Sequence, residues 1–237
     1  MNSKECIVLA GGLGTRLRGV IGDQPKCMAP VGGQPFLHWL FRYLDRQGCT
    51  RCVLSLGYRH EVVLDWLQTQ DLPFEVDYVI EHEPLGTGGG MVLALQNCQH
   101  EQVFVVNGDT LFNASLEDLL QTHLNADAET TLALKPMQDF ERYGTVEIAS
   151  GNEITAFAEK QPCQEGLING GIYVISRTTF VSRLFPAKFS FEKDYLEATV
   201  GEGRLYASLD SGYFIDIGVP DDYERAQTEI PQVLGAS

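Results

Sequence analysis

Short apolar runs alternate with segments of helical spacing in the first half of the chain, and this order restricts the fold more than any other feature. Strands are predicted where apolar residues are continuous or alternate, at residues 6–10, 52–56, 74–80 and 103–106. Helices are predicted at residues 36–47, 60–67, 90–96 and 115–125. The last of these has Ser115 as a candidate N-cap and Asp118 three residues later. Repeated strand–helix–strand order predicts a mostly parallel sheet with helices on both faces.

The second half is richer in strand patterns, and it contains neither a flexible linker nor an internal repeat. Further strands are predicted at residues 130–134, 144–148, 153–158 and 170–175. These strands would extend the same sheet and make it mixed. The prediction is therefore an α/β protein with one Rossmann-like domain over residues 1–237. Ligands of such sheets bind beyond the carboxyl ends of the strands.

Composition excludes several classes of partner. The net charge is −15, whereas nucleic acids and anionic membranes bind basic surfaces. No apolar run approaches the roughly 18 residues that span a bilayer. The first five residues lead directly into a strand pattern, so we expect no signal peptide and a cytoplasmic location. An acidic protein that binds phosphates should concentrate its cations and recruit a metal ion.

The six cysteines are irregularly spaced, and Cys49 and Cys52 form a lone C-x-x-C motif. A zinc site would require a second pair of ligands at matched spacing. A redox role stays open, and reduced, partly buried thiols are the simpler interpretation. The five histidines have no ligand-like spacing, and we expect Trp39 and Trp66 to lie in the core.

A glycine-rich loop, Gly11-Gly12-Leu13-Gly14-Thr15-Arg16-Leu17, follows the first predicted strand directly. Its backbone N–H groups can form an anion-binding nest, and Arg16 and Lys26 add cations. A Walker A loop would need Gly-Lys-Ser/Thr, which is absent. A dinucleotide fingerprint would need a third glycine where Leu17 stands. On the residues alone, an anion site and a purely structural turn both stay open.

The loop with its flanking residues 9–17, followed by Pro25-Lys26-x-Met28-Ala29-Pro30, resembles the signature of the nucleoside-diphosphate-sugar pyrophosphorylases, the sugar-1-phosphate nucleotidyltransferases. Further motifs occur in the family's order over essentially the whole chain. The resemblance implies the nucleotide-diphospho-sugar transferase fold, with residues 1–125 mainly binding nucleotide and residues 126–237 mainly binding sugar phosphate. The implied reaction converts a nucleoside triphosphate and a sugar 1-phosphate into an NDP-sugar and pyrophosphate. Cys27 departs from the family, which often has proline there.

The resemblance also implies roles for individual residues. It assigns catalysis to Arg16, Lys26 and Asp109. The implied nucleotide-binding residues are Leu9, Ala10, Gly11, Gly12, Gly14, Thr15, Arg16, Lys26, Glu81, Pro84, Gly86, Thr87, Gly88, Asn107 and Gly108. Asp109 ends an apolar strand and Asp216 stands inside an apolar stretch, where an unpaired carboxylate would be costly. The resemblance resolves this cost by assigning both carboxylates to Mg²⁺, the expected cofactor.

Acceptor residues are implied in the second half. The sugar-phosphate-binding residues by resemblance are Tyr143, Gly144, Glu159, Lys160, Asn169 and Gly170. An alternative stays open at these positions, namely exposed charges beside a strand and a glycine bulge.

The identity of the base rests on residues 81–89, where Glu81 could accept hydrogen bonds from guanine N1 and N2. Backbone groups could recognise the base instead. The resemblance is strongest to enzymes that transfer GMP from GTP to D-glycero-α-D-manno-heptose 1-phosphate, for lipopolysaccharide, capsule or S-layer glycan synthesis. Mannose 1-phosphate guanylyltransferase, N-acetylmuramate 1-phosphate uridylyltransferase and a non-catalytic nucleotide-sugar-binding regulator are the alternatives. Neither a nucleic acid nor a membrane is expected as a partner, and a homo-oligomer stays open.

Overall fold

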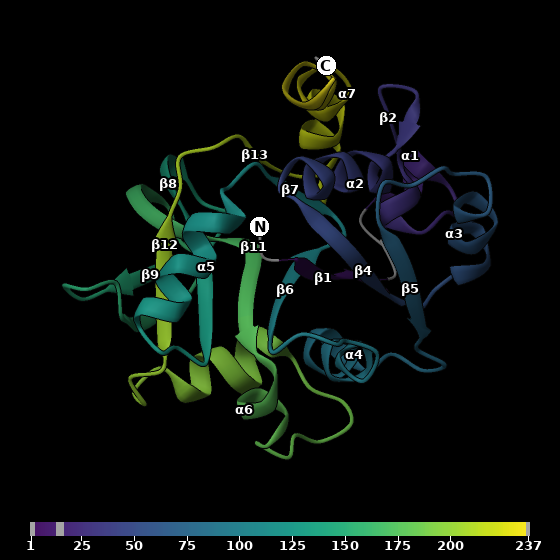
Figure 1. Cartoon of the computed structure of the whole chain (residues 1–237). Coiled ribbons are helices and arrows are strands. Elements are labelled where there is room, and N and C mark those ends of the chain that lie inside the picture. Colours follow the sequence, from purple (N-terminus) through teal and green to yellow (C-terminus); the bar gives the residue numbers. More distant parts are fainter. Residues whose placement is uncertain (1–2, 13–16, 236–237) are drawn as a thin grey trace.

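The computed structural model describes residues 3–12 and 17–235, which form a layered arrangement of helices around a sheet (Figure 1). The strands in these ranges are β1 (Lys4–Ala10), β2 (Pro30–Val31), β3 (Gln34–Pro35), β4 (Cys49–Leu56), β5 (Glu75–Ile80), β6 (Gln102–Asn107), β7 (Thr110–Phe112), β8 (Thr130–Phe140), β9 (Thr145–Ile148), β10 (Ile154–Ala158), β11 (Cys163–Ser176), β12 (Leu205–Leu209) and β13 (Phe214–Asp216). The helical elements are α1 (Arg18–Ile21), η2 (Lys26–Met28), α2 (Phe36–Arg46), α3 (His60–Leu67), α4 (Gly86–Leu95), α5 (Leu116–Asn125), α6 (Arg177–Val181), η3 (Phe191–Glu197) and α7 (Pro220–Leu234).

One large sheet organises the described chain. Its main path runs in the order β10-β9-β11-β6-β1-β4-β5, with β8 beside β11 and β12 beside β8. The pairs β6–β1, β1–β4 and β4–β5 are parallel, whereas β11 pairs antiparallel with β6, β8 and β9. The predicted α/β class with a mostly parallel, mixed sheet is therefore confirmed.

Helices cover both faces of the sheet, and successive residues of β1 enter different cores. Cys6 and Val8 belong to the core that α2, α5 and α7 complete. Ile7 lies in the opposite core, with α4, α6 and η3. This explains why residues 6–10 of β1 form a continuous apolar run, because that part of the strand is covered on both faces.

Several elements differ from their predicted bounds for identifiable reasons. The helix expected at residues 90–96 begins at Gly86, because glycines at its start pack under a distant segment. A Cβ at Gly88 would lie only 2.2 Å from the Phe189 ring, so this turn requires glycine. Strand β8 continues past the predicted end at residue 134 to Phe140, and β11 begins at Cys163, before the predicted start at residue 170. The added parts pair with each other through partly exposed residues, which show no hydrophobic pattern in the sequence.

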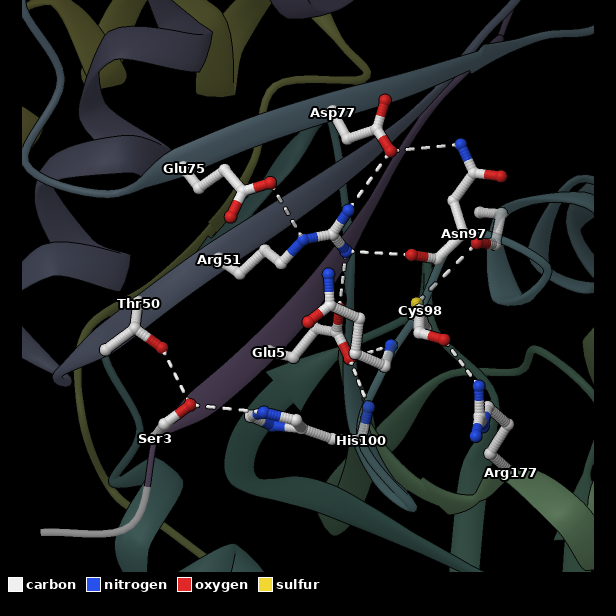
Figure 2. Close-up of polar contacts among 12 residues, drawn as sticks. Ser3, Glu5, Thr50, Arg51, Glu75, Asp77, Asn97, Cys98, His100 and Arg177 are labelled. Carbon is white, nitrogen blue, oxygen red and sulfur yellow. Dashed lines mark hydrogen bonds and ion pairs between the residues drawn. The ribbon is translucent and has the colours of Figure 1, made fainter.

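A closed cluster of charges lies at the amino-terminal edge of the parallel strands (Figure 2). Glu5, Arg51 and Glu75 occupy paired positions on β1, β4 and β5. The Arg51 guanidinium bonds to Glu5 at 2.6 Å, to Asp77 at 3.1 Å and to Glu75 at 3.3 Å. This cluster ties three strands together at the end remote from the glycine loop.

Two smaller findings bear on the composition. Over the described ranges, no helix combines the length and the apolar character that crossing a bilayer requires. The cysteines are free thiols, and Cys49 and Cys52 are both buried within β4. The Cys49 thiol donates to the carbonyl of Arg51 at 3.1 Å.

Candidate active site

The carboxyl ends of β1 and β6 border a cavity of about 390 Å³, which also reaches the start of α4. Its lining residues are Leu9, Ala10, Gly11, Gly12, Lys26, Cys27, Glu81, Pro84, Gly86, Thr87, Gly90, Asn107, Gly108 and Asp109. The cavity therefore lies at the sheet edge where parallel α/β folds bind their ligands. We call it the first cavity.

Glu81 forms one wall of the first cavity and lies against the glycine loop. A Cβ at Gly11 would stand 2.5 Å from Glu81 Oε1, so only glycine permits this approach. Oε1 accepts a hydrogen bond from Ser55 Oγ at 3.0 Å, and Oε2 accepts one from the Leu85 N–H at 3.2 Å. These bonds fix the carboxylate and leave further acceptor positions, because a carboxylate has about four lone-pair sites.

Lys26 lies between two carboxylates, and we call this group the Lys26 junction. Lys26 Nζ is 2.5 Å from Asp109 Oδ2 and 3.3 Å from Asp216 Oδ1. The lysine side chain is 11% exposed, whereas those of Asp109 and Asp216 are 39% and 27% exposed. The carboxylates thus remain open to a ligand while they surround one cation.

Backbone pairing brings the two carboxylates together from distant parts of the sequence. Strand β7 pairs antiparallel with β13, which places Asp216 opposite Thr110. The Ile217 N–H donates to the carbonyl of Asp109 at 3.1 Å, and the Gly218 N–H donates to Asp216 Oδ1 at 2.7 Å. Two carboxylates directed at one point are a suitable donor set for a divalent cation.

The structure gathers most residues that the sequence assigned to the nucleotide. Gly88 does not line the cavity, because it lies beneath Phe189. Thr87 does line it, and its hydroxyl also donates to Glu192 at 2.7 Å. The positions Gly14, Thr15 and Arg16 lie outside the described residues.

Cys27 and Gly90 line the cavity but were not among the predicted residues. Their signals were available, since Cys27 follows Lys26 and Gly90 ends the run of glycines that begins at Gly88. Burial, together with a smaller contribution from the nearby Asp109 carboxylate, raises the pKa of the Cys27 thiol to about 12. We therefore expect this thiol to remain protonated and unreactive at neutral pH.

The predicted acceptor residues occupy three places, and Glu159, Lys160 and Asn169 line neither the first cavity nor the cavity beside Tyr143. Tyr143 lines a second cavity of about 390 Å³, which also borders Asp216. Glu159 and Lys160 are exposed in the connection between β10 and β11. Asn169 donates to the Tyr173 hydroxyl at 3.0 Å, and Asn169 Oδ1 accepts from the Gly171 N–H at 3.0 Å.

Gly144 and Gly170 are both packed closely against neighbouring residues. A Cβ at Gly144 would lie 2.4 Å from the carbonyl of Ala158, and one at Gly170 would lie 2.3 Å from Phe112. A side chain at either position would therefore require the neighbouring residues to shift.

Comparison with known proteins agrees with this geometry. Residues 5–233 match the family model described as nucleotidyl transferase. D-glycero-α-D-manno-heptose 1-phosphate guanylyltransferase from Aneurinibacillus thermoaerophilus is 45% identical, covering 97% of this chain and 100% of that protein. The enzyme of the same name from Campylobacter jejuni is 42% identical, covering 92% and 96%. The crystal structure of HddC from Yersinia pseudotuberculosis complexed with GMP-PN has a TM-score of 0.83 at 35% identity, covering 94% and 98%. The chain therefore belongs to the nucleotidyl transferase family.

Proposed function

We propose that the protein transfers GMP from GTP to D-glycero-α-D-manno-heptose 1-phosphate and releases pyrophosphate. The two relatives that carry this activity in their names are 45% and 42% identical over nearly the whole chain. The observation that carries the proposal is the Lys26 junction. It borders the first cavity through Asp109 and the second cavity through Asp216, so it lies where two phosphorylated substrates would meet.

The choice of GTP is supported by Glu81. Guanine presents two adjacent N–H donors, at N1 and N2, and a carboxylate can accept both. Uracil presents a single ring N–H at the corresponding edge. Glu81 is fixed in the wall of the first cavity by Ser55 and Leu85, so its oxygens are positioned before a base enters.

The chemistry requires no general base. A phosphate monoester has a second pKa near ~6, so the acceptor phosphate is mostly a dianion at neutral pH. One of its oxygens forms a bond to the α-phosphorus of GTP. The bond from that phosphorus to the oxygen bridging to the β-phosphate breaks, and pyrophosphate departs. Lys26 supplies positive charge where these groups meet. By the family resemblance, Arg16 would stabilise the α-phosphate and the departing pyrophosphate.

Asp109 and Asp216 would hold the Mg²⁺ ion that we propose as the cofactor. Both carboxylates converge on one cation in the structure, and carboxylate oxygens are the protein ligands that Mg²⁺ prefers. When bound, Mg²⁺ would neutralise part of the phosphate charge. The chain's own task is to direct both carboxylates at one point through the β7–β13 pairing.

We also propose a cytoplasmic location, because GTP is supplied in the cytoplasm. The product is an activated sugar, which suits the synthesis of a surface polysaccharide such as a lipopolysaccharide, capsule or S-layer glycan. The glycosyl transfer that consumes it would release GDP.

Pyrophosphate release from a panel of the four nucleoside triphosphates and several sugar 1-phosphates, with Mg²⁺, tests the proposal. We expect the highest kcat/KM for GTP with the heptose 1-phosphate. Turnover with UTP alone would refute the guanylyl assignment. Binding of GTP without turnover of any acceptor would favour a non-catalytic regulator.

A further inference from the structure

The second cavity and the first cavity both border the Lys26 junction. Its walls come from residues 137–143, from β13 and from the start of α7. Asp216 borders this cavity, whereas Asp109 borders the first one. An acceptor whose phosphate lies at the junction can therefore extend its sugar into the second cavity.

A buried carboxylate organises the polar wall of the second cavity. Asp222 is only 7% exposed, and one of its oxygens accepts from Arg142 while the other accepts from Arg225 at 3.1 Å. Arg142 also donates to the Tyr143 hydroxyl at 3.1 Å. A guanidinium has five N–H donors, and these bonds use two of those in Arg142. With its side chain 42% exposed, Arg142 can present further donors to a ligand.

Aromatic rings form the apolar part of the same cavity. Tyr143 packs edge-on against Phe214, with 5.6 Å between the ring centroids. Phe214 packs in the same way against Phe112 on β7, at 5.8 Å. A fixed guanidinium beside aromatic rings is suited to a polyhydroxyl ligand, whose oxygens accept hydrogen bonds and whose C–H groups pack on the rings.

The charges of the wall favour a neutral ligand over a second anion. Four carboxylates line the cavity, against the two guanidinium groups of Arg142 and Arg225, and they belong to Asp139, Glu141, Asp216 and Asp222. A phosphate would meet a net negative wall here. Sugar hydroxyls carry no charge, and they can accept from a guanidinium and donate to a carboxylate.

We propose that the second cavity receives the sugar of the acceptor and that Arg142 determines specificity by binding hydroxyl groups at the end remote from the phosphate. The inference rests on the proposed function. A heptose has one more hydroxyl-bearing carbon, C7, than mannose, and its C6 and C7 hydroxyls are adjacent. Arg142 keeps its Nε–H and Nη1–H groups to donate to these oxygens, because Asp222 and the Tyr143 hydroxyl both accept from Nη2 and hold the guanidinium in place.

The test compares two acceptors with Arg142→Gln. The measured quantity is the ratio of kcat/KM for the heptose 1-phosphate to that for mannose 1-phosphate, at saturating GTP. We expect this ratio to fall at least about tenfold, because a site built for a hydroxyl discriminates strongly against its absence. The KM for GTP should stay within about twofold, because Arg142 does not line the first cavity.

Arg142→Lys is the second variant, since it keeps the charge beside Asp222 but lacks the additional Nε–H and Nη1–H donors. A smaller fall in the same ratio is expected, and thermal unfolding reports whether each variant is folded. An unchanged ratio, with both acceptors weakened equally, would overturn the inference because it would leave Arg142 a structural role. A rise in the KM for GTP larger than the acceptor effect would also overturn it. A wild-type enzyme that turns over only mannose 1-phosphate would instead refute the heptose assignment, and the recognition of C7 with it.

Discussion

The two ends of the parallel strands carry two clusters of charge that differ in how completely the chain satisfies them. At the amino-terminal edge, Glu5 has no exposed surface, and it accepts from Arg51 and from the N–H groups of Gln99 and His100 (Figure 2). At the carboxyl edge, Asp109 keeps 39% of its side chain exposed beside Lys26. In the closed cluster the hydrogen-bond partners of Glu5 all belong to the protein, whereas at the Lys26 junction Asp109 and Asp216 keep exposed oxygens that a ligand can reach. A cluster of charges is therefore not enough to indicate a ligand-binding site. What indicates one here is that the carboxylates at the carboxyl edge of the sheet keep oxygens free for further bonds.

Removing the central cation of the closed cluster should give the largest effect. Arg51→Met would leave the fully buried Glu5 with only the backbone N–H donors of Gln99 and His100. Glu75 and Asp77, the other partners of Arg51, are carboxylates and cannot replace it. We expect the free energy of unfolding to fall by about 3–5 kcal/mol, as when a buried ion pair loses one partner. Urea unfolding followed by circular dichroism measures this loss, and the turnover of the folded protein should be preserved.

The matched control for Arg51 is Arg59→Met. Arg59 also bonds to two carboxylates, those of Asp23 and Glu61, but its side chain is 40% exposed. Such a solvent-exposed pair should contribute little to stability, because water and salt screen it. Equal losses in the two variants would contradict the distinction between closed and exposed clusters.

Asp109→Asn tests the Lys26 junction, and here activity should change while stability does not. The variant should lose about 10²–10³-fold in turnover, because a neutral amide would weaken both the contact with Lys26 and the proposed metal site. Its free energy of unfolding should change by less than about 1 kcal/mol, since Asp109 is partly exposed. The pyrophosphate-release assay and urea unfolding measure the two quantities. Asp65→Asn, on the exposed side of α3, is the control, and normal turnover in Asp109→Asn would remove this residue from the site.

His123 is a buried side chain whose stabilising effect depends on its staying uncharged. Its ring is 1% exposed and bonds to Thr131 and Ser176, the latter paired with the first residue of β6. Burial lowers the pKa of His123 to about 4 from the usual 6.5. The unfolded chain therefore binds a proton between these values and the folded chain does not. Stability from this residue is complete above about pH 6.5 and falls by up to about 3 kcal/mol as the pH drops to 4.

The measurement for His123 is the difference in unfolding free energy between the wild type and His123→Gln, followed from pH 7 to pH 4. This difference should shrink as the pH falls, because only the wild type loses stability through the histidine. Parallel profiles would show that His123 is not the neutral buried group described above. Taking the difference cancels the carboxylates that titrate in both proteins.

The sequence predicted the core of the fold because the central residues of β1, β4 and β6 are buried on both faces and form short, mostly apolar runs. It located Lys26 and Asp109 because each borders a strand or loop with a recognisable motif. The closed cluster escaped prediction, since Glu5 and Arg51 lie just before the predicted strands 6–10 and 52–56 and belong to no motif. The contact of Arg142 with Asp222 also escaped, because it depends on how α7 packs beside residues 137–143. Pairings between distant charges leave no local pattern.

Glu81→Gln has the smallest expected effect, and it tests whether the first cavity selects guanine over other bases. A glutamine amide would present one donor where the carboxylate presents acceptors, so one of the two guanine N–H groups would lose its partner. We expect kcat/KM for GTP to fall about tenfold, or about 1.4 kcal/mol, with little change for UTP. Glu83→Gln is the control, because Glu83 is exposed in the same loop and does not line the first cavity. An equal fall in kcat/KM for GTP and UTP would mean that Glu81 supports the glycine loop without selecting the base. Glu81 would then have a structural role, as Glu5 has at the opposite end of the strands.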